Sequence, residues 1–445
     1  MSLSKNLINA RHHLVFLLGL SVAFGIVFSI EQRQFTHDLA ADLRYSEQIP
    51  APKPRPLTAQ ERRWAEVAWQ YFANNTQASG LVNSVDGYPS TTLWDTASYL
   101  MGLIAARRLD LINASEFEQR LSSALDALAQ LPLYDQQLPN KAYDTRSLAM
   151  VNYDNSVNER GIGWSAIDIG RLLVPFNILV WDYPSYTDQL NRVLARWDLA
   201  PLLQRGLMYG ATIANEQTQY VQEGRIGYEE YAAKSLSLMG QDVSQALRYT
   251  DFLVFEQIDG VEVPTDSRDP SRYKAHNYVV SESYILDGLE FGWDRISHEF
   301  AWRVYQAQYA RYQRTGLLTA VSEDNIDRPP YFVYNTVFSD GKHWNAVGDD
   351  GSDAAQYKTL STKASFGWYA LYRDQYSQQL LTEASKLFDP DKGWYSGKYE
   401  NFDEINQALT ANTNGIILES LLYIQQGQLL NIGRIGPVQL AQKEE

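Results

Sequence analysis

The feature that most constrains the fold is one kind of segment that recurs along the chain. A loop rich in glycine, asparagine, aspartate and aromatic residues leads into an apolar helix that opens with an acidic or small polar residue. The openings recur roughly every 50 to 80 residues, which leaves room for two helices and a loop. The six openings begin near Leu93, Gly163, Tyr228, Ser281, Lys363 and Asn412.

More polar helices with an apolar stripe lie between these segments, for example over residues 116–131 and 298–315. Buried helices can be apolar all round, whereas surface helices show one apolar stripe. The pattern therefore predicts an all-α fold, an (α/α)6 toroid with an inner and an outer ring of helices. An irregular helical domain and a helical solenoid are the alternatives. Strand-like runs such as residues 331–338 are predicted to form short hairpins over one mouth.

The N-terminal segment from Leu14 to Ile30 carries no charge. Its length is at the short end of what spans a bilayer. Lys5 and Arg11 precede it and acidic residues follow it, which favours a cytoplasmic N-terminus. We expect a single-pass anchor in the bacterial inner membrane with the main domain in the periplasm. The alternative is a cleaved signal peptide, with Ser21 and Ala23 at the cleavage site.

A proline-rich stretch separates this segment from the globular part. Pro50, Pro52, Pro54 and Pro56 alternate with other residues, which favours an extended polyproline spacer. Thr58, followed three residues later by Glu61, is a capping-box pattern and marks the first helix. The predicted organisation is residues 1–31 for the cytoplasmic start and anchor, 32–57 for the stalk, 58–430 for the toroid and 431–445 for a tail.

Composition excludes several classes of function. The formal charge is −15, and a surface this acidic repels nucleic acid and anionic lipid. There is no cysteine, so disulfides and thiolate chemistry are absent. The sequence has no H-E-x-x-H motif, nucleophile elbow, P-loop or dinucleotide fingerprint, and we expect no metal and no cofactor. The run from Asp349 to Asp353 lacks the glutamate of a calcium loop and is expected to be a solvated turn.

Acidic side chains concentrate at the predicted helix openings. Helix beginnings in a toroid gather at its mouths, and paired carboxylates suit cleavage of a glycosidic bond. Capping and ion pairing are the simpler explanations for any single carboxylate. The candidates for the general acid are Glu282 and Glu223, and those for the second carboxylate are Asp95, Glu230 and Asp324.

The chain is also rich in aromatic residues, with 11 Trp and 29 Tyr. Most of these rings must lie in the core, but a ring face also suits the apolar face of a sugar. The predicted stacking residues are Trp94, Trp164, Tyr228, Tyr334 and Trp394, and Arg225 and Lys141 are predicted to bind hydroxyl groups.

Several segments together resemble the bacterial family known as domain of unknown function 3131, over residues 60–430. This family is similar to glucoamylase-like six-hairpin proteins, including enzymes that act on bacterial β-glucans. The resemblance implies an (α/α)6 toroid and a carbohydrate ligand, and it supplies no catalytic pair. The segments that carry it are residues 94–99, 139–141, 163–171, 222–225, 228–233, Glu282, 287–294, 319–324, 393–395 and 412–416.

The working hypothesis is a membrane-anchored glycoside hydrolase or transglycosylase acting on an envelope or exported polysaccharide. The alternative is a non-catalytic module that binds glycan or scaffolds an exopolysaccharide synthesis complex. A third option, a polysaccharide lyase, is disfavoured by the acidic balance. Two unpaired carboxylates facing each other across an aromatic cleft would favour the enzyme. Neutralisation of every carboxylate at the mouth by Arg or Lys would favour the scaffold.

Overall fold

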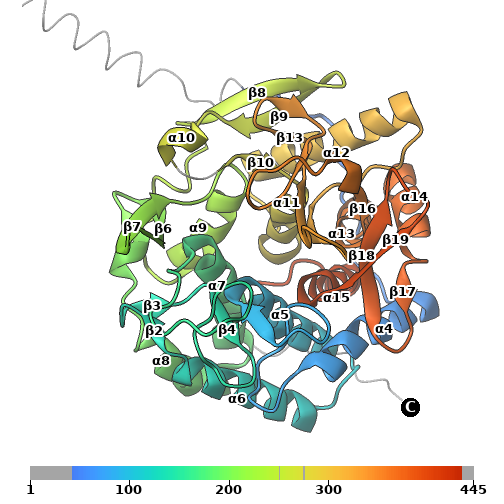
Figure 1. Ribbon diagram of the computed structural model, residues 1–445. Helices are drawn as coiled ribbons and strands as arrows, with labels where there is room; N and C mark the ends of the chain where they lie inside the picture. Colours follow the sequence, from blue (N-terminus) through green and yellow to red (C-terminus); the bar gives the residue numbers. More distant parts are fainter. Residues whose placement is uncertain (1–42, 250, 274–275, 433–445) are drawn as a thin grey trace, which may run out of the picture. The chain divides into compact units, whose positions relative to one another are not determined.

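A closed ring of six helices forms the centre of the structure (Figure 1). The computed structural model describes residues 43–249, 251–273 and 276–432. Each helix of the ring packs against the next in chain order, and the last packs against the first, as predicted for the inner ring. The six are α5 (Leu93–Arg108), α7 (Ala166–Asp182), α9 (Tyr228–Leu238), α11 (Glu282–Leu286) with its π-helical continuation η3 (Asp287–Phe291), α13 (Thr362–Tyr372) and α15 (Ala411–Gln426).

Small residues allow these helices to approach closely. Gly170 of α7 faces Ala232 of α9, where an added Cβ would lie 2.6 Å from the Ala232 Cβ. Gly415 of α15 faces Ser98 of α5, and a Cβ there would lie 2.8 Å from the Ser98 carbonyl oxygen. An alanine at either glycine would push two helices of the ring apart, because protein interiors are close-packed.

An outer layer of helices covers the ring. Its members are α4 (Ala59–Asn75), α6 (Ala114–Gln130), α8 (Thr187–Leu194), α12 (Arg295–Thr315) and α14 (Gln375–Ala384). The predicted capping box of Thr58 and Glu61 begins α4. Between α9 and α11 the described residues contain only the short helix α10 (Pro270–Tyr273), and a strand hairpin packs against α12 instead of a sixth outer helix.

The prediction of an all-α fold is wrong in one respect, because the loops between outer and inner helices contain many short antiparallel strands. Backbone groups in long loops need hydrogen-bond partners, and here the loops supply them to one another. The strands are β1 (Ser90–Thr92), β2 (Leu133–Tyr134), β3 (Leu138–Pro139), β4 (Ala142–Asp144), β5 (Leu203–Gln204), β6 (Leu207–Ala214), β7 (Gln217–Gln222), β8 (Leu253–Ile258), β9 (Val261–Asp266), β10 (Tyr278–Val279), β11 (Glu323–Asn325), β12 (Phe332–Asn335), β13 (Phe338–Ser339), β14 (Lys342–His343), β15 (Ala346–Val347), β16 (Thr359–Ser361), β17 (Phe388–Asp389), β18 (Gly393–Tyr399) and β19 (Ile405–Leu409).

These strands form small sheets, with the orders β1-β4, β2-β3, β5-β6-β7, β8-β9, β10-β13-β14, β11-β12-β15 and β16-β18-β17, the last joined by β19 on β18. The predicted strand-like run over residues 331–338 contains β12 and the start of β13, which lie in different sheets. β12 pairs with β11 and β15, and β13 pairs with β10 and β14. Single 3-10 turns occur at η1 (Pro184–Tyr186), η2 (Ala200–Leu202) and η4 (Ala355–Tyr357).

The N-terminal predictions meet the structure only in part. Residues 14–30, the predicted anchor, lie outside the described residues, within which no helix is long and apolar enough to cross a membrane. Residues 48–57 of the predicted stalk belong to the same compact unit as the toroid. The Arg55 backbone N–H donates to the Ile424 carbonyl, and its guanidinium pairs with Glu61 at 2.7 Å.

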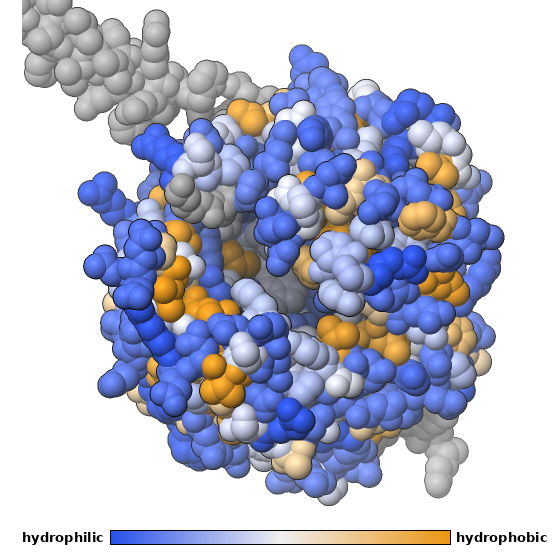
Figure 2. Space-filling model, viewed as in Figure 1, coloured by the Kyte–Doolittle hydropathy of each residue, from blue (hydrophilic) through white to orange (hydrophobic). Residues whose placement is uncertain are grey.

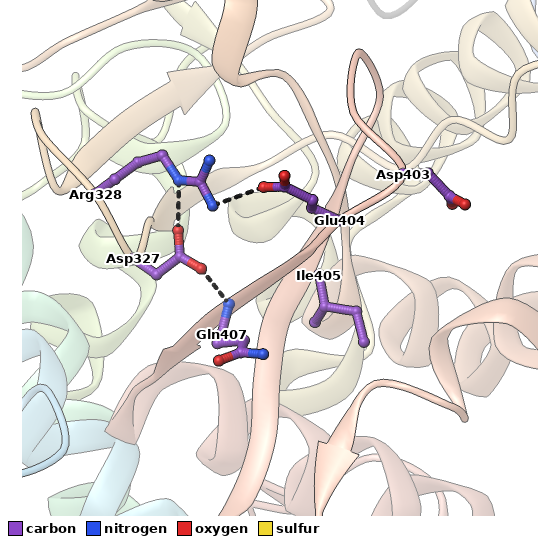
Figure 3. A pocket seen from close by; sticks show the side chains of 6 residues that line it. All are labelled: Asp327, Arg328, Asp403, Glu404, Ile405 and Gln407. Carbon is purple, nitrogen blue, oxygen red and sulfur yellow. Dashed lines mark hydrogen bonds and ion pairs between the residues drawn. The ribbon is translucent and has the colours of Figure 1, made fainter.

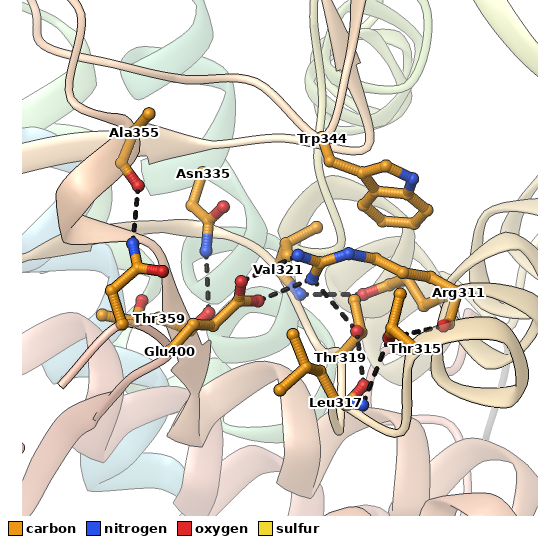
Figure 4. A network of polar contacts seen from close by, with 12 residues as sticks. Arg311, Thr315, Leu317, Thr319, Val321, Asn335, Trp344, Ala355, Thr359 and Glu400 are labelled. Carbon is orange, nitrogen blue, oxygen red and sulfur yellow. Dashed lines mark hydrogen bonds and ion pairs between the residues drawn. The ribbon is translucent and has the colours of Figure 1, made fainter. Parts of the chain in front are cut away.

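A polar network ties the outer helix α12 to the strands beyond it (Figure 4). Arg311 forms two hydrogen bonds to the carboxylate of Glu400, at 2.6 and 2.8 Å, and its guanidinium lies 5.0 Å from the centre of the Trp344 ring. It also donates to the Thr319 hydroxyl at 3.1 Å. This network holds the start of the segment that leads to β11 and β12.

A second network is buried inside the ring itself. Arg171 of α7 pairs with Glu290 of η3 and with Glu419 of α15, and none of the three side chains is exposed. Its guanidinium also lies 5.7 Å from the centre of the Trp94 ring in α5. Arg171 thus connects three ring helices beneath Trp94.

Candidate active site

Side chains from the first turns of five inner helices meet, which shows that these helices begin at the same end of the ring. Trp94 of α5 donates a hydrogen bond to Glu282 of α11, and its ring lies 5.8 Å from that of Tyr228 in α9. Asn412 of α15 and Lys363 of α13 also contact Glu282. The face in Figure 2 is hollowed over the centre of the ring. Helix N-termini carry partial positive charge, so acidic side chains are favoured here.

Glu282 lies at the floor of this mouth, where side chains from three other helices hold it. The Nε1 of Trp94 and the Nδ2 of Asn412 donate to its Oε1, each at 2.8 Å. The Nζ of Lys363 lies 2.5 Å from its Oε2. Glu282 is only 2% exposed. The two hydrogen bonds fix its carboxylate in place, and the ammonium of Lys363 compensates the negative charge.

Lys363 also contacts two acidic residues of strand β11. Its Nζ lies 3.4 Å from Oδ1 of Asp324 and donates to the backbone carbonyl of Glu323. Burial raises the pKa of Asp324 to about 6 and that of Glu323 to about 7, although Lys363 opposes both shifts. One ammonium therefore contacts the carboxylates of Glu282 and Asp324 and the backbone carbonyl of Glu323. The side chains of Asp324 and Glu323 titrate near neutral pH.

Asp168 and Glu223 form a second acidic group at the start of α7. The backbone N–H of Ala166 donates to Oε2 of Glu223 at 2.6 Å, and the Ser165 hydroxyl donates to Oδ1 of Asp168 at 3.0 Å. Burial and the charge of Glu223 raise the pKa of Asp168 to about 7, while Lys141 opposes the shift. Burial also raises the pKa of Glu223. Among the described residues neither carboxylate forms an ion pair, and the charge of Glu223 disfavours ionisation of Asp168.

Asp95 lies in the first turn of α5, next to both groups. Its Oδ2 accepts hydrogen bonds from the hydroxyls of Ser84 at 2.6 Å and Thr92 at 2.8 Å. Burial raises its pKa, and Lys363 opposes that shift. The charge of Asp95 also raises the pKa of Asp168, which places the two acids within electrostatic reach of each other.

The candidates at the start of α9 have structural partners. Oε2 of Glu230 accepts the backbone N–H of Gly227 at 2.7 Å, so it caps its own helix. The neighbouring Glu229 pairs with Arg268 at 2.5 Å. Arg225 is buried and donates to Oε1 of Gln222 at 3.0 Å. The contacts found for Glu230 and Arg225 are therefore with their own loop and helix start.

The aromatic candidates divide by burial. Trp94, Tyr228 and Tyr334 are partly exposed. Trp164 and Trp394 are fully buried and pack in the core, where their indole N–H groups donate to backbone carbonyls. A fully buried ring offers no face to a sugar, so the structure contradicts the stacking role predicted for these two residues.

Sequence reasoning missed four residues of this site, Asp168, Glu323, Lys363 and Asn412. A signal for Asp168 was present, because it follows the helix cap Ser165 at the spacing at which Asp95 follows Thr92. Glu323 and Lys363 had no such signal, because their proximity depends on the packing of a strand against a helix opening.

A separate pocket, which shares no lining residue with the floor cluster, lies around Arg328 (Figure 3). Arg328 bridges Asp327 and Glu404 there, at 2.9 and 3.0 Å, and the carboxylate of Asp327 accepts the backbone N–H of Gln407. These ion pairs join the turn after β11 to β19. In the described part of the chain, no group of three or more His, Asp or Glu side chains is placed to hold a metal ion.

Residues 63–427 match the family model described as protein of unknown function DUF3131. The chain belongs to this family. The match covers both the ring and the acidic mouth, in agreement with the resemblance seen in the sequence. No curated protein matches the chain.

Solved structures share this fold at low sequence identity. The endo-β-1,2-glucanase from Chitinophaga pinensis superposes with a TM-score of 0.58 at 11% identity, over 84% of this chain and 94% of that one. The endo-β-1,2-glucanase from Talaromyces funiculosus gives 0.55 at 12% identity, over 83% and 84%. A Bacteroides caccae protein provisionally assigned as a glucoamylase gives 0.60 at 11%, over 83% and 94%. The likeness establishes a glucoamylase-like (α/α)6 toroid fold.

Proposed function

We propose that this protein is a glycoside hydrolase or transglycosylase that acts on a polysaccharide, and that the polysaccharide is a β-glucan. The observation that carries the proposal is the group of unpaired carboxylates, Asp168 and Glu223, beside a hydrogen-bonded acidic floor at the mouth. The fold is shared with endo-β-1,2-glucanases, which supports the choice of substrate.

Asp168 is the proposed general acid. A pKa of about 7 keeps a large fraction protonated at neutral pH, as proton donation to a glycosidic oxygen requires. Glu223 helps to hold that proton, because two neighbouring carboxylates resist being ionised together. The first turn of α7 positions both, since Ser165 and the N–H of Ala166 bind their oxygens.

Asp95 is the proposed second carboxylate, which activates water or an acceptor sugar. Two hydroxyl groups orient one of its oxygens, and the residue lies on the ring helix next to α7. Glu323 is the competing candidate, because it also titrates near neutral pH. Azide restoring activity to Asp95→Gly but not to Glu323→Gly would assign the role to Asp95.

The floor cluster is proposed to bind sugar hydroxyls. A fixed carboxylate, ammonium and amide from Glu282, Lys363 and Asn412 offer both acceptors and donors in a rigid arrangement. This differs from the sequence-based choice of Glu282 as the acid. The reason is that Lys363, Trp94 and Asn412 already occupy both oxygens of Glu282, whereas Asp168 and Glu223 form no ion pair among the described residues.

The assignment is tested by comparing Asp168→Asn, Glu223→Gln and Glu282→Gln on β-1,2-glucan, with kcat and KM measured across pH. Asp168→Asn should abolish kcat, whereas Glu282→Gln should mainly raise KM. In the wild type, kcat should fall as pH rises through about 7, where Asp168 loses its proton. Full turnover by Asp168→Asn would contradict its role as the acid.

The second candidate function is a module that binds glycan without cleaving it, within an exopolysaccharide synthesis complex. The ion pairs of Glu282 with Lys363 and of Glu229 with Arg268 favour it, because neutralised carboxylates need no catalytic role. A glycan that raises the melting temperature but yields no products would support this alternative.

We also propose that the chain is anchored in the bacterial inner membrane through residues 14–30, with the toroid in the periplasm. The uncharged run and the basic residues before it support this placement. Full-length protein in the membrane fraction, released by deletion of residues 1–42, would agree with it. Equal solubility of both forms would contradict it.

A further inference from the structure

The backbone of Glu223 is held on both sides by residues that bind the same oxygen of Glu229. The N–H of Glu223 donates to the carbonyl of Met208 at 3.1 Å, and the N–H of Met208 donates to Oε1 of Glu229 at 3.3 Å. The Nε2 of Gln222 donates to the carbonyl of Glu223 at 2.9 Å and to Oε1 of Glu229 at 2.8 Å. One carboxylate oxygen therefore fixes the partners of both backbone groups of Glu223.

The side-chain amide of Gln222 has one orientation in this arrangement. Its Oε1 accepts a hydrogen bond from Nη1 of Arg225 at 3.0 Å. A guanidinium has only donors, so the amide oxygen must face Arg225 and the NH2 group must face Glu229. Gln222 and Glu229 are both buried, so these hydrogen bonds form away from bulk water.

Arg268 holds the other oxygen of Glu229. Its Nη1 lies 2.5 Å from Oε2 of Glu229, and its Nε lies 2.9 and 3.0 Å from the two carboxylate oxygens of Asp266, the last residue of β9. Its guanidinium also lies 4.3 Å from the centre of the Phe252 ring. Asp266 accepts the backbone N–H of Ile226 at 3.0 Å. The buried Arg268 therefore connects the end of the β8–β9 hairpin to the loop that leads into α9.

The side chain of Glu223 occupies a narrow space between β6 and the start of α7. Its Oε2 accepts the backbone N–H of Ala166 at 2.6 Å. Gly210 of β6 lies beside its Oε1, where an added Cβ would be 2.1 Å from that oxygen. The hydroxyl of Ser165, the residue before Ala166, donates to Asp168 at 3.0 Å. A displaced Glu223 backbone would therefore move its carboxylate away from the helix start that also binds Asp168.

We propose that Arg268 is a positioning residue that acts on Glu223. It acts through Glu229 and Gln222, and it keeps the Glu223 carboxylate beside Asp168. The proposal rests on the proposed glycoside hydrolase function and adds a residue that does not touch the polysaccharide. A buried ion pair loses the hydration of both charges and contributes little net stability, so the pair of Arg268 and Glu229 is better explained by the geometry that it fixes.

Hydrogen exchange of backbone amides tests the link without a substrate. In the full-length protein, Arg268→Met removes the cation that holds Glu229. The amides of Met208 and Glu223 should then exchange about tenfold faster, because the groups that fix them are released. Mass spectrometry of short peptides that contain these amides gives the rates.

Arg311→Met serves as the control, because Arg311 is also a buried guanidinium that pairs with a carboxylate and lies over an aromatic ring. It should leave exchange at Glu223 within about twofold of the wild type. Gln222→Met removes an amide but no charge, and it should raise exchange at Glu223 about three- to fivefold. Unchanged exchange in both Arg268→Met and Gln222→Met, or an equal rise in Arg311→Met, would overturn the proposal.

The pH profile of kcat on linear β-1,2-glucan separates positioning from stability. Besides burial, the charge of Glu223 disfavours ionisation of Asp168, with a smaller contribution from Asp95, and Lys141 opposes both. In Arg268→Met the fall in kcat should therefore move to lower pH by about one unit, and Arg268→Lys, which keeps a cation, should recover part of the shift. An unchanged profile in Arg268→Met would overturn the positioning role even if exchange is faster. Faster exchange together with a wild type that releases no product would keep the link to Glu223 and reject the hydrolase.

Discussion

Replacing Asp168 by asparagine should make the protein more stable at pH 8 while abolishing turnover. The folded protein raises the pKa of Asp168 from 3.8 to about 7, through burial and the charge of Glu223. A carboxyl group with a raised pKa destabilises the fold once it is ionised, and each pKa unit corresponds to about 1.4 kcal/mol. The shift therefore sets an upper bound of about 4 kcal/mol, and we expect a gain of roughly 2–4 kcal/mol.

The gain in stability depends on pH, because the pKa of Asp168 is higher in the folded protein than in the unfolded chain. Below about pH 4 the carboxyl is protonated in both the folded and unfolded states, so Asp168→Asn should match the wild type. The gain should grow as pH rises and be complete above about pH 7. Urea unfolding at pH 4, 6 and 8 measures the difference directly.

Asp144→Asn is the matched control. The folded protein lowers the pKa of Asp144 to about 2, with hydrogen bonds from Ser147 and Asn155 outweighing burial. Its ionised form therefore stabilises the fold above about pH 4, and the substitution should destabilise the protein at pH 8. If Asp168→Asn also destabilises the protein at pH 8, burial and the charge of Glu223 do not destabilise the ionised form of Asp168.

Three further predictions follow from the buried charges. Lys363→Met should destabilise the protein by about 3–5 kcal/mol in urea unfolding, because it leaves Glu282 buried without its cation, and adding Glu282→Gln should restore part of the loss. Arg171→Met should destabilise the protein by a similar free energy and also lower kcat, since Arg171 connects two other ring helices and contacts the ring of Trp94. An unchanged kcat would show that these contacts stabilise the fold only. Arg311→Met should destabilise the protein through loss of its paired contact with Glu400 without changing the pH profile of kcat, and a shifted profile would contradict this separation.

The ring of helices could be predicted from sequence because its signal is local and repeated. The inner helices are apolar, and four of the six follow a capping side chain, at Thr92 in α5, Ser165 in α7, Ser361 in α13 and Thr410 in α15. Apart from the run at residues 331–338, the strands escaped prediction because most contain only two to four residues, too short for an alternating pattern to stand out.

The sequence predicted that acidic and aromatic side chains form the site, but it did not predict the role of each residue. Glu223 and Glu282 both lie at the mouth, yet only the packing of α13 against α11 shows that Lys363 neutralises Glu282. Trp164 and Trp394 follow the same loop-to-helix pattern as Trp94, but burial separates them, and burial depends on the whole fold.

The most direct test of the central claim is a product assay in water enriched in oxygen-18. Protein from residue 43 onward is incubated with linear β-1,2-glucan, and released oligosaccharides are analysed by mass spectrometry alongside Asp168→Asn. A glycoside hydrolase should release oligosaccharides that carry one oxygen-18 at the new reducing end, whereas Asp168→Asn should release none; a transglycosylase should release products without the label. No products from β-1,2-glucan or from other bacterial polysaccharides, together with a raised melting temperature, would contradict the enzyme and leave a glycan-binding module.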